Sequence, residues 1–488
     1  MRKKTILFFC LILILGIIPR IITAFSNLPF TDEAGYSLLV SKKIVFDHIF
    51  PLVGFNLNYE WHITKGPGWF YTLAIPIILG NGNPIFAKIF TVFADLVGIT
   101  FTFYLLKKAF DLKTATLVSF FLSVSPWFID QVGYIWPPFF APIFIILFLL
   151  FTMKFIQGKK NYSLLIALML GFIGQYEIAI MIFLLGQIII LLPLAFKKKL
   201  IDLKRLLYSF LVFVITMLPI IIYDLTHNFY SLRGFVILFS ELSKGHGQSI
   251  LSKLPQRVDT FTWGFRSTFS PNIILSITIL FILLFGLYLY FKDKKIINDQ
   301  KRFIIFLTVT PLLKFVFSFF YPGPAALWHY LDLNIIYCFL LGIILTYLLK
   351  YKRLQFLTYF ICAIIFIAFV NRNVNNYKNG FELSFNVDRI KQSPVINYAF
   401  KTSMRKPFQY VLFSSSPLKT DFEYLFWWYS AKEYKGQSYQ NGKITYLIFS
   451  PNYSLTPEEK KKYAKYLQAK VVSEKIFPNG YALKRVED

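Results

Sequence analysis

Runs of about 20 apolar residues recur along this sequence and constrain its fold more than any other feature. The first is LFFCLILILGIIPRIITAF at 7–25, and a helix needs roughly 20 such residues to cross the hydrocarbon core of a bilayer. Only 16% of the 488 residues are charged, compared with about 25% in soluble proteins. The sequence therefore predicts an all-α polytopic membrane protein.

The apolar runs predict eleven transmembrane helices. They lie at about 5–25, 84–106, 114–129, 137–155, 162–177, 178–196, 206–224, 272–291, 303–320, 328–349 and 354–370. One further run, GWFYTLAIPIILG at 68–80, contains a proline and is too short for a span. We expect this run to form an interfacial or re-entrant helix.

Basic residues decide the orientation of these spans. With 68–80 left out, every second loop carries a cluster of lysine or arginine, on the same side as the N-terminal MRKK. The positive-inside rule places that side in the cytoplasm of a multi-pass protein of the cell membrane. The net charge of +27 then reflects topology, and we expect no nucleic-acid partner. Since no small-residue cleavage site follows the first run, we predict an anchor and not a signal peptide.

This topology leaves three long segments on the outer side, at about 26–83, 225–271 and 371–488. We expect 1–370 to form the transmembrane domain and 371–488 to form a small extracytoplasmic α/β domain. Strands are predicted at 410–413, 443–449, 471–477 and 481–485, and helices at 420–434 and from a capping box at Thr456 to about Ala469. The sequence Pro478-Asn479-Gly480 predicts a hairpin between the last two strands.

Ionisable groups beside apolar spans cost free energy, so their positions indicate function. On the predicted outer side they gather at the span ends. The group consists of Arg20, Asp32, Glu33, Glu60, His62, Lys65, Lys88, Asp130, Glu177, Asp224, His227, Arg233, His329 and Asp332, with Asp95 and Lys314 inside spans. Loops of any protein contain charges, and Arg20 could snorkel to the interface. The concentration therefore indicates a site on the outer face without ranking its members.

Several of these residues lie in segments that resemble one enzyme family. Arg20 followed by PFTDEAGY, and a loop ending in KGPGWFYTL, is similar to the start of the membrane glycosyltransferases of the GT-C fold. The relatives in question are family 39: aminoarabinose transferases, protein O-mannosyltransferases and RgtA/RgtB-like sugar transferases. Further similar segments are SPWFIDQVGYIWPPFFAPIFIILFL at 125–149, PIIIYDLTHNF at 219–229 and WHYLDL at 328–333. The resemblance runs from about residue 10 to 350 and does not include the tail.

The resemblance implies an enzyme that takes a sugar from a polyprenyl-phosphate carrier and passes it to an acceptor hydroxyl on an envelope glycan, lipid or protein. A carboxylate that accepts the hydroxyl proton assists such a step. By this resemblance Asp32 is the general base, and Glu33 orients it or binds the acceptor. Cationic groups stabilise the phosphate that leaves. Lys65 is assigned to that phosphate, with His227, Arg233 and Arg20 as further candidates, while Glu60, His62, His329 and Glu177 are accessory or acceptor-binding candidates.

The sequence departs from the family pattern at two places. Some relatives carry an acid before the proline of the fourth span, where this chain has Trp136-Pro137-Pro138. The glutamate that precedes the Lys-Pro step in aminoarabinose transferases is Thr64 here, and relatives that bind a divalent metal use that position. Glu60 and His62 are the nearest substitutes as oxygen and nitrogen ligands. No cofactor other than such a metal is predicted. The three cysteines all lie in apolar runs, which excludes a disulfide framework and a cysteine-based metal site.

Two alternative functions stay open at this point. A transporter or flippase of lipid-linked saccharide would show internal repeats and charged residues near the middle of several spans, and we find no convincing repeat. An O-antigen polymerase or ligase would carry a functional arginine- and histidine-bearing loop late in the chain. The acidic pair in the first outer loop favours the transferase over both.

Overall fold

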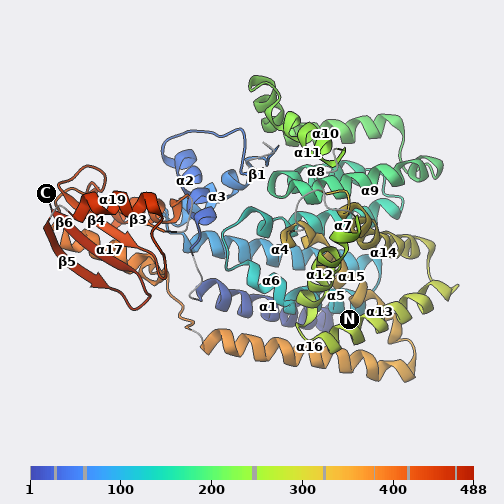
Figure 1. Cartoon of the computed structure of the whole chain (residues 1–488). Coiled ribbons are helices and arrows are strands. Elements are labelled where there is room, and N and C mark those ends of the chain that lie inside the picture. The colour runs from blue at the N-terminus through green and yellow to red at the C-terminus, as the bar shows by residue number, and fades with distance from the viewer. Residues whose placement is uncertain are drawn as a thin grey trace.

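The computed structural model describes residues 2–26, 30–58, 63–243, 250–321, 326–378, 380–414, 418–467 and 470–487. Within these residues, a helical domain stands beside a smaller α/β domain formed by the C-terminal part of the chain (Figure 1). Short helices from the first outer segment lie at the junction between the two domains. The expected all-α membrane domain with a small C-terminal α/β domain is therefore confirmed.

A helix lies at each of the eleven predicted spans. These helices are α1 (Arg2–Phe25), α4 (Ile85–Ala109), α5 (Leu112–Val124), α7 (Pro142–Ile156), α8 (Tyr162–Tyr176), α9 (Ile178–Lys197), α10 (Leu203–Thr226), α13 (Ile273–Lys292), α14 (Asn298–Ser318), α15 (Leu331–Leu348) and α16 (Lys352–Lys378). Six helices of the described residues are long and apolar enough to cross a membrane, and several others are apolar but shorter. The number of true spans stays a prediction.

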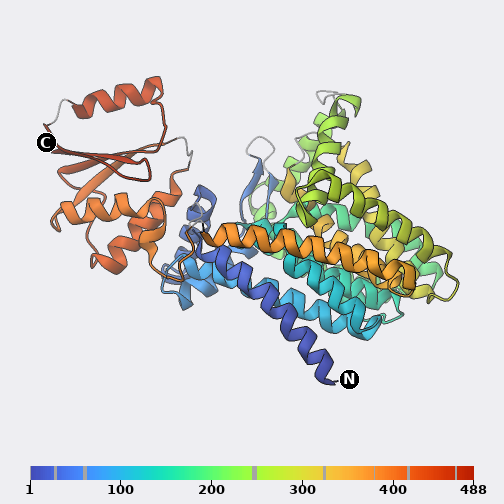
Figure 2. The ribbon, with the colours of Figure 1, turned by 90° about the horizontal axis from the view of Figure 1, so that it is seen from below.

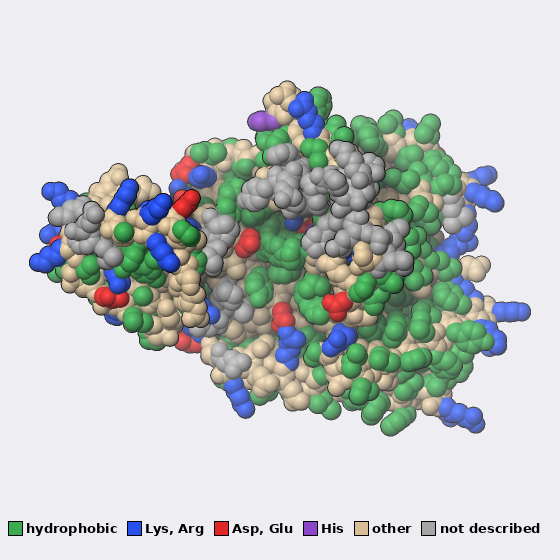
Figure 3. Space-filling model, in the orientation of Figure 1, with side chains coloured by type: hydrophobic (Ala, Val, Ile, Leu, Met, Phe, Trp, Pro, Cys, Tyr) green, Lys and Arg blue, Asp and Glu red, His purple; other side chains and the backbone are tan. Residues whose placement is uncertain are grey.

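Helix α15 lies at the centre of the helical domain, where every one of its residues is buried. Helices α5, α7, α12, α13 and α14 pack around it. The outer helices expose large apolar side chains such as Ile274, Phe281 and Phe356, and such side chains cover much of the face shown in Figure 3. Apolar residues on the outside of a helical bundle are expected where lipid and not water surrounds the protein.

The outer segments 26–83 and 225–271 form α2 (Asp32–Phe46), the hairpin of β1 (Asn56–Asn58) and β2 (Ile63–Thr64), α3 (Gly68–Leu79), α11 (Tyr230–Ser243) and α12 (Ile250–Phe269). Three short helices, α6 (Pro126–Gln131), η1 (Pro137–Phe140) and η2 (Leu327–Tyr330), lie at the ends of the predicted spans 114–129, 137–155 and 328–349. The short helix predicted at 68–80 is confirmed as α3. No helix was predicted within 225–271, because polar residues interrupt the apolar positions of α12 and its helical periodicity is therefore weak.

The C-terminal domain is built around a four-stranded sheet with the order β3-β4-β6-β5. Its elements are η3 (Val387–Arg389), α17 (Ser393–Thr402), β3 (Phe408–Phe413), α18 (Thr420–Trp428) with a π-helical turn η4 (Tyr429–Glu433), β4 (Ile444–Phe449), α19 (Pro457–Leu467), β5 (Lys470–Ile476) and β6 (Ala482–Glu487). Strands β3 and β4 are parallel, and β5 and β6 form the predicted antiparallel hairpin. All four predicted strands and both predicted helices are present.

The two faces of this sheet bury different side chains, because neighbouring residues of a strand point to opposite sides. Phe408 faces α17 and α18, where it meets Phe400 and Phe426, and Tyr446 packs against Phe408 on the same face. Leu447 and its neighbours face α19. Figure 2 shows the sheet edge-on, with α19 on one side and α17 and α18 on the other. Helix α18 is thereby held on the sheet with its outer side free to contact α2.

Candidate functional site

The acidic pair lies at the start of α2. Thr31 caps this helix, since its hydroxyl accepts a hydrogen bond from the amide of Ala34 at 3.3 Å. Carboxylates in the first turn of a helix interact favourably with its dipole, which suits Asp32 and Glu33 at these positions. The Asp32 side chain is buried, whereas that of Glu33 is exposed.

The carboxylate of Asp32 is held by the C-terminal domain. Its Oδ2 accepts the amide hydrogen of Leu418 at 3.1 Å, and its Oδ1 accepts that of Thr420 at 3.0 Å. The Thr420 hydroxyl also donates to the Asp32 carbonyl at 2.6 Å. Gly35 allows this approach, because a Cβ there would lie 2.3 Å from the backbone at Thr420 and Asp421. These contacts join residues almost 390 positions apart and were not predicted from the sequence.

Lys65 is placed by the hairpin of the first outer segment. Its amide donates to the carbonyl of Phe55 and its carbonyl accepts from the amide of Gly54, both at 2.8 Å. The glycines that follow in KGPG allow Gln175 to pack against the loop, since a Cβ on Gly66 would lie 2.0 Å from the Gln175 Oε1. The same Oε1 accepts the amide hydrogen of Gly68 at 3.0 Å. The Lys65 side chain therefore enters the helical domain from a fixed backbone.

Inside the helical domain, Lys65 meets Glu177. The Lys65 Nζ lies 2.6 Å from the Glu177 Oε2, and both side chains are buried. Glu177 has extended backbone and occupies the break between α8 and α9. Its Oε1 lies 3.9 Å from the Nε2 of His329, which is contributed by η2. The structure thus brings together three candidate residues that lie far apart in the sequence.

Two cations of α12 lie close to His329 and were not predicted from the sequence. Arg257 is fully buried and donates to the carbonyl of Tyr321 at 3.0 Å, and Lys253 lies 3.4 Å from that carbonyl. The Tyr321 ring in turn lies 5.8 Å from that of His329. Residues four apart share one face of a helix. The spacing of Lys253 and Arg257 was the signal that could have revealed them, had α12 been recognised as a helix.

A second buried pair, Lys314 and Asp332, adjoins these residues. The charges of Lys65, Arg257, Lys314 and Glu177 all lie within electrostatic reach of the His329 ring. We call the group of Lys65, Glu177, Lys253, Arg257, Lys314, His329 and Asp332 the cationic cluster. Among the described residues it contains four cations and two carboxylates. Its buried cations make this cluster a candidate anion-binding site.

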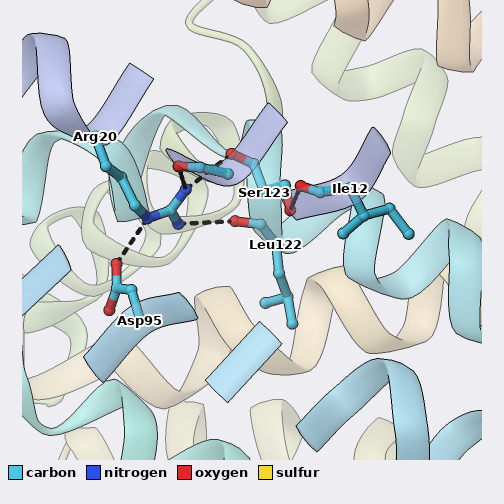
Figure 4. A network of polar contacts seen from close by, with 6 residues as sticks. Ile12, Arg20, Asp95, Leu122 and Ser123 are labelled. Atoms are coloured by element: carbon cyan, nitrogen blue, oxygen red, sulfur yellow. Dashed lines mark hydrogen bonds and ion pairs between the residues drawn. The ribbon is translucent and has the colours of Figure 1, made fainter. Parts of the chain in front are cut away.

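Arg20 does not join the cationic cluster. Its guanidinium pairs with Asp95 at 3.0 Å and donates to the carbonyls of Gly16, Leu122 and Ser123 at 3.0–3.2 Å (Figure 4). These bonds link α1 with α4 and α5 in the interior of the helical domain. Arg20 was expected at the interface or at the donor phosphate, but its partners here give it a structural role.

The candidates of the second outer segment lie on the surface. His227 is exposed and stacks on Tyr223, with 4.0 Å between the ring centroids. Arg233 is also exposed, on α11. Nearby, the Asp224 carboxylate accepts the amide hydrogen of Ser231 at 2.8 Å and thereby stabilises the start of α11. The structure brings neither His227 nor Arg233 into the cationic cluster, and their assignment to the phosphate stays a prediction.

Asp130, another outer-face candidate, contacts the Arg372 guanidinium of α16. Burial raises the pKa of the Asp130 carboxyl, and the charge of Arg372 opposes that increase. This pair ties α6 to the end of α16 and gives Asp130 a structural partner.

The predicted metal ligands Glu60 and His62 lie outside the described residues. The remaining described residues contain no group of three or more histidine, cysteine, aspartate or glutamate side chains placed to hold a metal ion. Thr64, which occupies the position of the family glutamate, is buried, and its hydroxyl lies 2.6 Å from that of Ser231. Metal binding therefore stays a prediction that rests on Glu60 and His62.

The sequence matches no known protein family and no curated protein, but the three-dimensional structure has counterparts. ArnT from Cupriavidus metallidurans bound to undecaprenyl phosphate superposes with a TM-score of 0.59 over 99% of this chain and 98% of that chain, at 11% identity. This chain has the fold of ArnT. The apo state of ArnT gives a TM-score of 0.57 at 12% identity, again over 99% and 98% of the two chains.

An oligosaccharyltransferase from Archaeoglobus fulgidus, tethered with an acceptor peptide containing the NVT sequon, is also similar. Its TM-score is 0.50 at 10% identity, over 87% of this chain and 63% of that chain. The ArnT-like superposition includes the C-terminal domain, which the sequence resemblance did not reach. The GT-C fold expected from the sequence is therefore confirmed.

Proposed function

We propose that this protein is an integral-membrane glycosyltransferase that moves a sugar from a polyprenyl-phosphate donor to an acceptor hydroxyl on the outer face of the membrane. The observation that carries this proposal is the cationic cluster, in which the buried cations Lys65 and Arg257 lie within electrostatic reach of His329 inside the helical domain. The ArnT-like fold supports the same reaction type, since ArnT has been crystallised with undecaprenyl phosphate.

The charge of the cluster suits the change in charge during transfer. A glycosyl phosphodiester carries one negative charge, and the phosphate monoester that leaves carries nearly two at neutral pH. Preorganised cations stabilise the charge that develops on the leaving group more than the charge of the ground state, and this difference lowers the barrier. We assign Lys65 and Arg257 to the phosphate because both are buried cations. Lys65 contacts Glu177, and the charges of both Glu177 and Arg257 reach Tyr321, so the two cations border the same region. His329 lies next to Glu177 and Tyr321.

The acidic pair is assigned to the acceptor. The acceptor oxygen attacks the anomeric carbon, the bond from that carbon to the phosphate oxygen breaks, and the hydroxyl proton passes to a carboxylate. Asp32 is the proposed base. Its two amide hydrogen bonds hold it in place, and each carboxylate oxygen can accept a further bond. The exposed Glu33 is proposed to bind the acceptor.

The arrangement of charge on the surface supports an outer location for this chemistry. Lysine and arginine side chains gather at the edge of the helical domain that is farthest from the C-terminal domain (Figure 3). The positive-inside rule assigns that edge to the cytoplasm. Helix α2, which begins with the acidic pair, and the C-terminal domain lie at the opposite end (Figure 1).

A transfer assay on the reconstituted protein tests this proposal. Vesicles containing the protein receive polyprenyl-phosphate sugars with a labelled sugar and a panel of envelope glycans, lipids and peptides. We expect transfer or slow hydrolysis in the wild type and a loss of at least about 100-fold in Asp32→Asn and Lys65→Ala. Asp47→Asn, at the exposed end of the same helix α2, is the matched control. Labelled carrier that crosses the bilayer without turnover would replace the transferase by a flippase.

A further inference from the structure

The contact between Asp32 and the C-terminal domain includes a second buried carboxyl, that of Asp421. Asp421 is the second residue of α18, and the Asp32 and Asp421 carboxyls lie within hydrogen-bonding reach of each other. Their exposed fractions are only 8% and 6%. Gln392 fixes the second carboxyl, because its Nε2 donates to both the Asp421 Oδ2 and the carbonyl of Phe30 at 2.8 Å.

One oxygen of this pair lacks a donor unless a proton is present. Among the described residues, no donor makes a hydrogen bond of regular geometry to the buried Oδ1 of Asp421, although the amide of Phe422 lies close enough to lower the pKa of this carboxyl. The oxygens of Asp32 already accept the amide hydrogens of Leu418 and Thr420. Two buried carboxylates in contact repel each other, and one proton held between them removes the repulsion and supplies the missing donor.

We propose that Asp421 is a positioning residue, which shares a proton with Asp32 and thereby latches the C-terminal domain onto α2. The protonated Asp421 donates to the ionised Asp32, which keeps the proposed base charged and oriented. The inference builds on the proposed function for its catalytic meaning, but the latch itself is a property of the contact between the two domains.

The surroundings of Asp421 favour the protonated form. Burial, followed by the nearby charge of Asp32, raises the pKa of Asp421 to about 7. The other titratable groups that face it are Tyr410 on β3 and Tyr481 before β6, and burial raises the pKa of both phenols, so they stay neutral. The Lys419 ammonium is bonded to a backbone carbonyl of β3 at 2.9 Å.

The sign of the pH dependence follows from this raised pKa. The latched state binds a proton that an exposed aspartate would have lost above a pH of about 4. The latch is therefore strongest in acid, weakens as pH rises from about 4 to about 7, and changes little above that. One linked proton lowers the latching equilibrium constant by about 20-fold between pH 5.5 and pH 7.5.

Hydrogen exchange on the full-length protein in lipid nanodiscs tests the latch. Amide protection in α18 and in the first turns of α2, corrected for intrinsic exchange rates, is compared at pH 5.5 and pH 7.5. We expect protection in the wild type to fall by about 20-fold over this interval and to change less than about 2-fold in Asp421→Asn, whose amide is neutral at both pH values. Glu423→Gln, an exposed position on the same helix α18, should behave like the wild type.

Two results would overturn the latch: a wild type whose protection does not change with pH, or an Asp421→Asn variant that keeps the wild-type change. The first comparison needs no variant, so a poorly folded Asp421→Asn leaves the test intact. The transfer assay separates this inference from the proposed function. A pH-dependent latch in a protein without transferase activity keeps the latch and refutes the function. With activity present, Asp421→Asn should retain its rate at higher pH than the wild type.

Discussion

Removing the negative charge of Glu177 should tighten the binding of polyprenyl phosphate. The Lys65 Nζ lies 2.6 Å from the Glu177 Oε2, and a phosphate oxygen bound on the other side of that ammonium would lie about 2.8 Å from it. The phosphate and carboxylate charges would then be roughly 5 Å apart. At an effective dielectric constant of about 20, the repulsion is about 3 kcal/mol for each unit of negative charge on the phosphate, which corresponds to at least roughly 100-fold in the dissociation constant.

The Glu177→Gln variant tests this value, since the amide keeps the shape of the side chain and loses its charge. We expect the protein to be destabilised by about 3 kcal/mol, because the buried Lys65 loses its counter-charge, and we expect bound polyprenyl phosphate to restore that stability. The measurements are equilibrium binding of a short-chain polyprenyl phosphate in detergent and thermal unfolding with and without it. Transfer should also slow, because the product phosphate leaves more slowly.

Asp95→Asn is the matched control, since it breaks another buried ion pair, with Arg20, away from the cationic cluster. It should cost a similar amount of stability and leave the dissociation constant for polyprenyl phosphate unchanged. If Glu177→Gln binds the phosphate no more tightly than the wild type, the anion does not lie beside Lys65 and our assignment of the site is wrong.

Three further variants separate the roles of other residues. Arg257→Gln should weaken polyprenyl-phosphate binding by roughly 10- to 100-fold, which corresponds to the free energy of one hydrogen bond to a charged group. Arg266→Gln, on the same helix α12, should leave that binding unchanged in the same assay. Arg20→Lys should lower the unfolding temperature without changing that binding, because an ammonium cannot reach all the carbonyls that the guanidinium reaches. Gly35→Ala should raise hydrogen exchange in α18 at every pH, because the added Cβ meets backbone at 2.3 Å.

The sequence predicted those parts of the fold that depend on composition and local pattern. The apolar runs located eleven helices of the helical domain, and alternation with turn signals located the four strands of the C-terminal sheet. Helices α2 and α12 were missed for a physical reason. Each buries only part of its surface against other helices, so its apolar positions are few and interrupted by polar residues, and hydropathy alone does not distinguish it from a loop.

The candidate site was predicted only in part, because burial of charge depends on contacts between distant segments. Lys65, Glu177 and His329 were identified as candidates, and the structure places them together. Arg257 was missed because its helix was missed. The buried contact of Asp32 with the C-terminal domain was missed because nothing near either residue in the sequence indicates the other.

The helical domain contains two groups of buried charges, one that we interpret as structural and one that we interpret as functional. Arg20 and Asp95 form a neutral pair, and the remaining bonds of the arginine go to backbone carbonyls, so the pair needs no further partner. The cationic cluster differs, since among the described residues it holds four cations and two carboxylates in the interior of the helical domain. Burying unbalanced charge is costly unless a ligand completes the site. We therefore expect the cluster to bind an anion, the phosphate of the proposed donor, at the predicted outer face.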